Sequence, residues 1–167
     1  MAVLVTFAGL PGTGKSTIAR HLSARLPAAW LRIDAIEQCL RDIQPDRHDM
    51  QTHGYHIAAA VAEGNLAAGH NVIADSVNPS PLTREIWSAI AEVADARELR
   101  VELICSDPVK HRHRVENRRP DITGLKLPDW SGVLNREYQP WTEADLHIDT
   151  AELSPDQAVE EIMAALG

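Results

Sequence analysis

Cysteine is scarce in this chain of 167 residues, which contains only Cys39 and Cys105. Two thiols cannot build a framework of several disulfides, and they cannot supply the four ligands of an all-cysteine zinc site. Such sparing use of cysteine is typical of proteins in a reducing compartment. We therefore expect a cytoplasmic protein that depends on a hydrophobic core for its stability.

Long apolar runs are also lacking. The mostly apolar run near the start of the chain, residues 2–8, falls far short of the roughly 20 residues that a membrane-spanning helix needs. It has neither a basic start nor a small-residue cleavage site, so it does not resemble a signal peptide. We expect no membrane partner and predict that this segment is a buried strand.

Positive charge is in deficit, since 16 Lys and Arg face 24 Asp and Glu for a formal net charge of −8. Proteins that coat nucleic acids or membrane surfaces are usually basic. The balance therefore disfavours a nucleic-acid partner, although a local basic channel would suffice for one. The only lysines are Lys15, Lys110 and Lys126, and none lies in the Asn-Lys-x-Asp motif by which GTPases read guanine.

What the sequence does contain is an alternation of apolar strands and helical segments. A chain of this length is expected to form one domain, here residues 1–167. The pattern predicts an α/β fold with a five-stranded parallel sheet and helices on both faces. The expected strands are residues 2–8, 30–33, 71–74, 99–105 and 146–148. The expected helices are residues 15–26, 35–43, 53–68, 81–96, 108–119 and 131–138, and a last one from 155, and Ser-Pro or Asp-Pro pairs at 80–81, 107–108 and 154–155 mark three of their starts.

Residues 9–17, Gly-Leu-Pro-Gly-Thr-Gly-Lys-Ser-Thr, match the phosphate-binding pattern G-x-x-x-x-G-K-[ST] at every fixed position. Glycines let the backbone N–H groups turn inward around an anion, and the next helix adds its positive end. A flexible turn is the alternative, but the strand before the loop and the helix after it favour nucleotide binding. Lys15 is expected to reach the β- and γ-phosphates of ATP and Ser16 to ligate Mg²⁺. The candidate nucleotide-binding residues of the loop are Gly9, Pro11, Gly12, Thr13, Gly14, Lys15, Ser16 and Thr17.

Two carboxylates end predicted strands, where parallel α/β sheets bind their ligands. Asp34, after the second strand, could accept the proton of a substrate hydroxyl, or it could cap the helix that follows. We favour the first role, and Glu37, one turn further along, could share the pocket. Asp75 ends the third strand as the Mg²⁺-holding Walker-B carboxylate does, with a turn residue as the alternative.

Residues 110–119 hold five of the 16 lysines and arginines of this acidic chain. On a helix, Arg114 and Arg118 share one face, whereas Arg112 and Arg119 share another. Guanidinium groups form forked hydrogen bonds with phosphate. We predict that a lid at about residues 107–128 closes over ATP and neutralises the transferring phosphoryl group, and an exposed helix face is the alternative.

Three histidines, His48, His53 and His56, cluster before the third strand. With a further ligand such as Asp49 they could bind a metal. We favour histidines that are exposed or line a substrate pocket.

Taken together, residues 9–17, Asp34, Asp75 and the arginine-rich lid resemble the P-loop kinases of small molecules and polynucleotides. That group includes chloramphenicol phosphotransferase, zeta toxins, gluconate kinase and adenylylsulfate kinase. Residues 105–107, 111–115, 124–128 and 136–141 are similar to bacterial chains labelled AAA-family ATPase or predicted kinase. The resemblance covers nearly the whole chain and implies a P-loop NTPase three-layer α/β/α sandwich, nucleoside-kinase-like, with a helical arginine-rich lid.

The resemblance also implies ATP and Mg²⁺ as cofactors and transfer of the γ-phosphoryl group to a hydroxyl of a small molecule. By it, Lys15 and the general base Asp34 are catalytic, and Arg112 or Arg114 is a lid arginine near the nucleotide. Two alternatives stay open, a polynucleotide 5′-hydroxyl kinase and an ATP-binding switch without an acceptor. A monomer or homodimer is expected. The remaining implied contacts are Arg118 and Arg119 with the phosphates and Thr150 near the adenine.

Overall fold

The computed structural model describes residues 1–45 and 52–167, which fold around one parallel sheet. The strands lie in the order β2-β3-β1-β4-β5, and every neighbouring pair is parallel. Their bounds are Val3–Ala8 (β1), Ala28–Arg32 (β2), Asn71–Asp75 (β3), Arg97–Ile104 (β4) and Leu146–Asp149 (β5). The predicted five-stranded parallel sheet is therefore confirmed.

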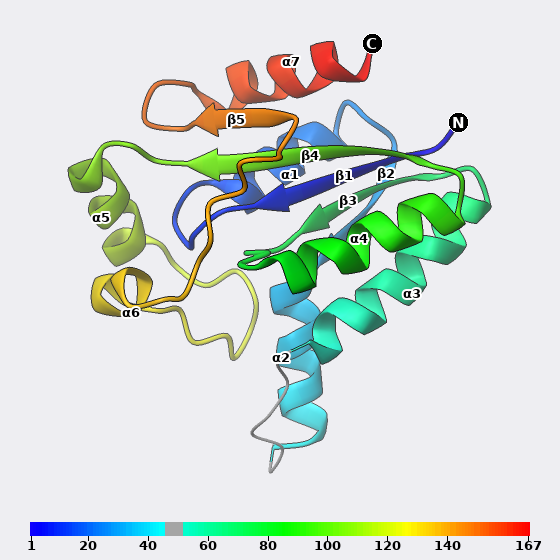
Figure 1. Ribbon diagram of the computed structural model, residues 1–167. Helices are drawn as coiled ribbons and strands as arrows, with labels where there is room; N and C mark the ends of the chain where they lie inside the picture. Colours follow the sequence, from blue (N-terminus) through cyan, green and yellow to red (C-terminus); the bar gives the residue numbers. More distant parts are fainter. Residues whose placement is uncertain (46–51) are drawn as a thin grey trace.

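Helices cover both faces of this sheet, which makes the predicted three layers (Figure 1). Helices α1 and α7 pack on one face, and α3 and α4 pack on the other. Helices α5 and α6 lie beyond the carboxyl ends of the strands, and α2 extends away from the sheet beside α3 (Figure 1). Their bounds are Lys15–Ser23 (α1), Ile33–Ile43 (α2), His53–Ala67 (α3), Pro81–Val93 (α4), Pro108–Asn117 (α5), Trp130–Leu134 (α6) and Pro155–Leu166 (α7).

The central strand β1 shows why the sequence reads as an unbroken apolar run. Val5 and Phe7 belong to the core under α1 and α7, whereas Leu4 belongs to the core under α3 and α4. All three side chains are fully buried. Both faces of a central parallel strand are covered, so successive residues must all be apolar.

The predicted helix starts at the three proline pairs are confirmed. Ser80 and Thr83 form a capping box at α4, and Ser154 and Gln157 form another at α7. At α5 the carboxylate of Asp107 accepts hydrogen bonds from two backbone N–H groups of the first turn, at 2.9 and 3.0 Å. These contacts satisfy donors that a helix cannot satisfy internally.

Three predicted boundaries near the site are wrong, and one of them is the end of α6, which spans Trp130–Leu134 and not 131–138. Strand β2 ends at Arg32, which pairs with the last residue of β3, and α2 begins at Ile33, so Asp34 lies in the first turn of that helix. Helix α5 ends at Asn117, two residues earlier than predicted, because Arg119 precedes Pro120 and a residue before proline disfavours helical geometry.

Within residues 1–45 and 52–167, no helix has the length and apolar character to span a membrane.

Candidate active site

A cavity of about 1050 Å³ opens at the carboxyl ends of the strands. Its walls come from the start of α1, one side of α2, the loop after β3, the end of α5 and the segment that follows α5. This is the position at which open α/β sheets bind ligands. Among the residues predicted for the site, those that line it are Pro11, Gly12, Gly14, Lys15, Ser16, Thr17, Asp34, Asp75, Arg114, Arg118, Arg119 and Thr150.

The loop formed by residues 9–17 has the backbone that its glycines predict. Gly9 has φ of 143°, and a side chain there would overlap the carbonyl oxygen of Leu103 on β4. Gly12 has φ of 86°, and a Cβ atom there would come within 2.5 Å of Val115 Cγ2 on α5. Neither position tolerates another residue without strain. Gly9 and the buried Thr13 lie beneath the surface of the cavity rather than on it.

Lys15 is a buried cation in the cavity. Its Nζ donates hydrogen bonds to the carbonyl oxygens of Gly9 at 2.7 Å and Leu10 at 3.0 Å. Burial lowers the pKa of Lys15 to about 8, although Asp75 and Asp34 oppose that shift by favouring the charged form. An ammonium group has three donors, so one remains for a phosphate oxygen.

Asp75 and Ser16 form the candidate metal position. Asp75 is 5% exposed, and burial raises the pKa of its carboxyl group. The positive charges of Lys15 and Arg32 and a hydrogen bond from Ser16 act in the opposite direction and lower this pKa. Carboxylate and hydroxyl oxygens are ligands that suit Mg²⁺, which usually keeps few protein ligands and takes others from phosphates and water. The described residues hold no group of three or more His, Cys, Asp or Glu that could bind a metal by itself. The donor set therefore fits Mg²⁺ held together with a nucleotide.

Asp34 lines the same cavity from the first turn of α2. It is exposed in the first turn of α2, and its carboxylate forms no hydrogen bond or ion pair with the described residues. The N-cap of α2 is Arg32, so the predicted alternative of Asp34 as a helix cap is wrong. The positive end of the helix favours a carboxylate there. Asp34 is therefore free to interact with a ligand.

Helix α5, the first part of the predicted lid, is connected to the phosphate-binding loop by hydrogen bonds. His111 is buried, and its Nε2 donates to the carbonyl oxygen of Pro11 at 2.8 Å. Arg114 donates to the hydroxyl and carbonyl oxygens of Thr150, at 2.8 and 2.7 Å. The Thr150 hydroxyl in turn donates to the carbonyl oxygen of Thr13 at 2.9 Å. Arg114 and Thr150 thus meet beside the phosphate-binding loop, and both line the cavity.

Arg112 lies elsewhere, contrary to its predicted place near the nucleotide. It is exposed, it does not line the cavity, and its Nε donates to Glu116 at 2.8 Å one helical turn away. Arg118 and Arg119 follow the helix and line the cavity. The Nε atom of Arg118 is buried without a partner among the described residues, and burial lowers the pKa of its guanidinium group.

Apart from Lys15 and Arg114, whose hydrogen bonds are described above, the Lys and Arg side chains of the cavity fall into two groups, those with an acidic partner and those without. Arg32 forms a two-bond ion pair with Asp121, at 2.8 and 3.1 Å, and Arg41 pairs with Glu37 at 3.0 Å. Four others form no ion pair or hydrogen bond through their side chains with any described residue. These four, which we call the open cations, are Arg118, Arg119, Lys126 and Arg136.

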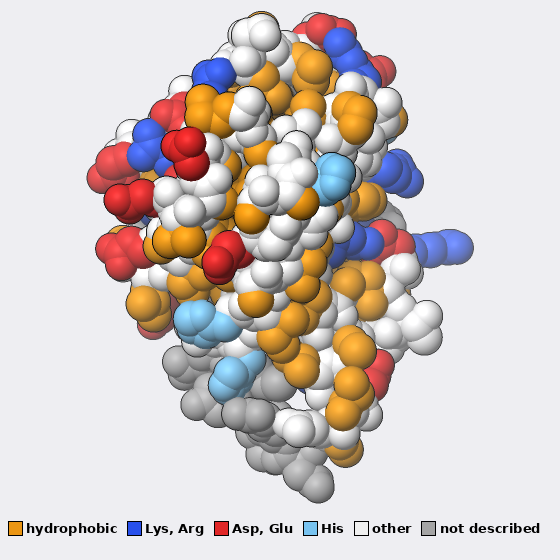
Figure 2. Space-filling model, turned by 90° about the vertical axis from the view of Figure 1, so that its right-hand side faces the viewer, with side chains coloured by type: hydrophobic (Ala, Val, Ile, Leu, Met, Phe, Trp, Pro, Cys, Tyr) orange, Lys and Arg blue, Asp and Glu red, His pale blue; other side chains and the backbone are white. Residues whose placement is uncertain are grey.

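Positive charge is concentrated at the cavity, which is lined by eight of the 16 Lys and Arg of the chain. Figure 2 shows the face at the amino ends of the strands, where Lys and Arg side chains are scattered among acidic and apolar ones. A cluster of open cations at one site in a chain of net charge −8 indicates an anionic ligand.

Sequence reasoning missed Arg136 as a site residue. The sequence predicts a helix over residues 131–138, but α6 ends at Leu134, so Arg136 lies in a stretch without helix or strand. Its charge nevertheless acts on Lys15, Glu37 and Arg118. The available signal was an arginine next to a cluster of aromatic residues and proline, at positions 136–141.

The predicted histidine cluster is only partly covered by the structure. His48 and Asp49 lie outside the described residues, and His53 and His56 belong to the first turn of α3. Neither of the two described histidines lines the cavity.

A comparison with known protein families identifies the family to which this fold belongs. Residues 4–125 match the AAA domain family. The chain belongs to this family. The matched stretch covers the phosphate-binding loop, α2, Asp75 and the segment after α5, so the AAA domain holds most of the cavity.

Relatives of this AAA domain chain are kinases. It is 29% identical to a shikimate kinase of Rhodopseudomonas palustris, over 97% of this chain and 80% of that protein. It is 25% identical to an adenylyl-sulfate kinase of Chloroflexus aurantiacus, over 98% and 88% of the two chains. The APS kinase of Mycobacterium tuberculosis, solved with AMPPNP and APS, has the same fold, with a TM-score of 0.72, 19% identity and coverage of 99% and 97%. The chain is thus a P-loop phosphotransferase of the kinase type.

Proposed function

We propose that this kinase transfers the γ-phosphoryl group of ATP to a hydroxyl group of a small molecule, with Asp34 as the general base. The observation that carries the proposal is that Lys15, Asp75, Asp34 and the open cations line one cavity, where Asp75 and Asp34 act electrostatically on Lys15. The kinase relatives named for shikimate and adenylyl sulfate support a small acceptor. A volume of about 1050 Å³ leaves room for such an acceptor beside a nucleotide.

The first contribution of the chain is to bind the triphosphate. Backbone N–H groups of residues 9–17, the start of α1 and the free donor of Lys15 face the β- and γ-phosphates. Ser16 and Asp75 would hold Mg²⁺, which when bound neutralises charge on the phosphate oxygens.

The second contribution is to activate and orient the acceptor. The carboxylate of Asp34 accepts the proton of the acceptor hydroxyl as its oxygen bonds to the γ-phosphorus and the bond to the β,γ-bridging oxygen breaks, releasing ADP. Arg118 and Arg136 stabilise the negative charge on the transferring group. We further propose that the reaction takes place in the cytoplasm.

A transfer assay tests this function. ATP labelled in the γ-phosphate is incubated with the protein, Mg²⁺ and a panel of hydroxyl-bearing metabolites, aminoglycosides, nucleoside sulfates and short RNA. We expect a labelled small molecule, and no label transfer by Lys15→Ala. Labelled RNA would instead support the polynucleotide alternative, and hydrolysis of ATP with no labelled acceptor would support the nucleotide switch.

A further inference from the structure

Arg136 needs an anchor, because it lies in a segment without regular structure. Helix α6 ends at Leu134, and β5 begins only at Leu146. The guanidinium group of Arg136 has no partner among the described residues that could hold it in the cavity. Its position must therefore come from the backbone on either side.

On the amino-terminal side, α6 provides the anchor. Trp130 packs edge-on against His111, with ring centroids 5.1 Å apart. Val133 is 1% exposed, and its carbonyl oxygen accepts a hydrogen bond from the N–H of Arg136 at 3.3 Å.

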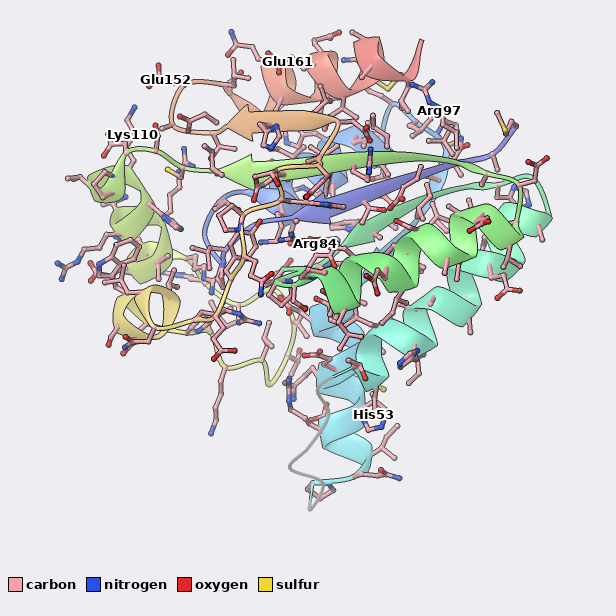
Figure 3. All side chains as sticks on the ribbon, viewed as in Figure 1. His53, Arg84, Arg97, Lys110, Glu152 and Glu161 are labelled. Atoms are coloured by element: carbon pink, nitrogen blue, oxygen red, sulfur yellow. The ribbon has the colours of Figure 1, made fainter. Side chains whose placement is uncertain are left out.

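On the carboxyl-terminal side, the anchor is the side chain of Arg84 from α4. It is 6% exposed and donates to three backbone carbonyl oxygens, those of Asn78 at 3.1 Å, Pro140 at 3.4 Å and Gln139. Its guanidinium carbon also lies 5.1 Å from the ring centroid of Trp141. Figure 3 shows Arg84 between α4 and the segment that leads from α6 to β5.

A second buried group supports the same stretch. Glu102 on β4 is 4% exposed and accepts hydrogen bonds from the Tyr138 hydroxyl at 2.6 Å and the Trp141 N–H at 2.8 Å. The N–H of Gln139 donates to the carbonyl oxygen of Pro79 at 2.8 Å. Residues 138–141 are thus tied both to the sheet and to the loop that follows Asp75.

We propose that Arg84, together with Glu102, is a positioning residue that clamps residues 138–141 and thereby holds the Arg136 guanidinium in the cavity. The proposal rests on the proposed function in that Arg136 acts there on the anionic substrates. Arg84 itself does not line the cavity. A buried arginine bonded to carbonyls stabilises any fold, so the test must report on residue 136 specifically.

Limited trypsin digestion of the full-length chain provides that report without any acceptor. Trypsin cleaves after Arg136, and cleavage after Lys126 serves as an internal reference measured by mass spectrometry. We expect Arg84→Gln to raise the ratio of cleavage at 136 to cleavage at 126 by about tenfold, because the loss of hydrogen bonds made by a charged group frees the segment. A ratio equal to that of the wild type would overturn the proposal.

Arg97→Gln is the matched control. Arg97 also donates to two backbone carbonyl oxygens, those of Leu166 at 2.9 Å and Ala165 at 2.7 Å, but it lies at the opposite end of the sheet (Figure 3). We expect the wild-type cleavage ratio. A rise as large as that of Arg84→Gln would mean general loosening and would overturn the proposal.

A second variant keeps the test informative if Arg84→Gln does not fold. Tyr138→Phe keeps the half-buried ring but removes the hydroxyl, which donates to Glu102 and also interacts with Arg84. We expect an intermediate rise in the cleavage ratio. An unchanged ratio for this variant also contradicts the clamp.

Kinetics with the acceptor found in the transfer assay supply the functional arm. Arg84→Gln and Arg136→Gln should each lower kcat/KM for that acceptor by about tenfold, and the double variant should be no worse than Arg136→Gln alone. Losses that multiply in the double variant would overturn the proposal. If no acceptor is phosphorylated, the proposed function fails, while the cleavage ratios still decide whether Arg84 positions residue 136.

Discussion

The two ends of the cavity differ in how their lining residues are distributed along the chain. At the end that we expect to bind phosphate, the lining residues come from one continuous stretch, residues 9–17, whereas at the α2 end they come from several separated segments. The phosphate end consists mostly of backbone, whose course is set by positive φ angles at Gly9 and Gly12. Lys15 Nζ donates hydrogen bonds to two carbonyl oxygens of the same loop. The α2 end is mostly side chains, such as Asp34 and Arg136. Under the proposed function, the first end binds the phosphates common to every reaction with ATP, and the second end is shaped for one particular acceptor.

This difference determines where a substitution should act. At the phosphate end a change should weaken nucleotide binding whatever the acceptor is. At the α2 end a change should leave nucleotide binding intact and impair transfer.

The largest effect is expected for Lys15→Ala. It removes the positive charge that the proposed function places against the β- and γ-phosphates, and we expect nucleotide affinity to fall by about a hundredfold or more and transfer to fall to background. Titration calorimetry with Mg-AMPPNP measures the first effect. Unchanged affinity would contradict the assignment of the loop, and an unchanged circular dichroism spectrum controls for folding.

The next effect is expected for Asp34→Asn, which keeps the shape of the side chain but removes the carboxylate that we propose as the general base. We expect transfer to the identified acceptor to fall by about a hundredfold or more, with Mg-AMPPNP affinity changed by less than about twofold. The matched control is Asp42→Asn, since Asp42 is on the same helix but does not line the cavity. Transfer at the wild-type rate would show that Asp34 is not the base.

A smaller effect is expected for Arg118→Gln, and it separates cations by their pairing. Arg118 lines the cavity and its Nε is buried without a partner among the described residues, so we expect kcat to fall by about tenfold. Arg112→Gln, on the exposed side of α5 and paired with Glu116, should change kcat by less than about twofold. Equal losses in the two variants would contradict the division between open and paired cations.

The smallest effect is a pH dependence of nucleotide binding. The pKa of Lys15 is lowered to about 8 by burial, and bound phosphates would favour its charged form. Binding should therefore take up a proton above that pH, and affinity should fall by roughly fourfold between pH 7 and 8.5. Calorimetry in buffers of different ionisation enthalpy measures the uptake. Affinity that does not change over this range, with no proton uptake, would contradict the prediction.

Local patterns made much of this architecture predictable. The sheet could be predicted because β1 is buried on both faces and reads as a continuous apolar run, and the phosphate-binding loop because all its residues are consecutive. Asp34 was misplaced by one element because β2 stops where its pairing with β3 ends at Arg32.

The α2 end was harder to predict because it depends on tertiary contacts. Charge alone does not tell which side of α5 faces the cavity, so the sequence leaves Arg112 and Arg114 as alternatives near the nucleotide. In the structure Arg112 donates to Glu116, whereas Arg114 donates to Thr150 and lines the cavity. The place of Arg136 depends on Arg84, 52 positions earlier in the chain. Contacts of that kind leave no local trace.

The most direct test of the central claim is a crystal structure of the protein with Mg-AMPPNP. The account predicts the β- and γ-phosphates inside the loop of residues 9–17, in contact with Lys15, and Asp34 facing the γ-phosphate across the cavity. A loop without phosphate, or Asp34 turned away from the γ-phosphate to bulk solvent, would contradict it.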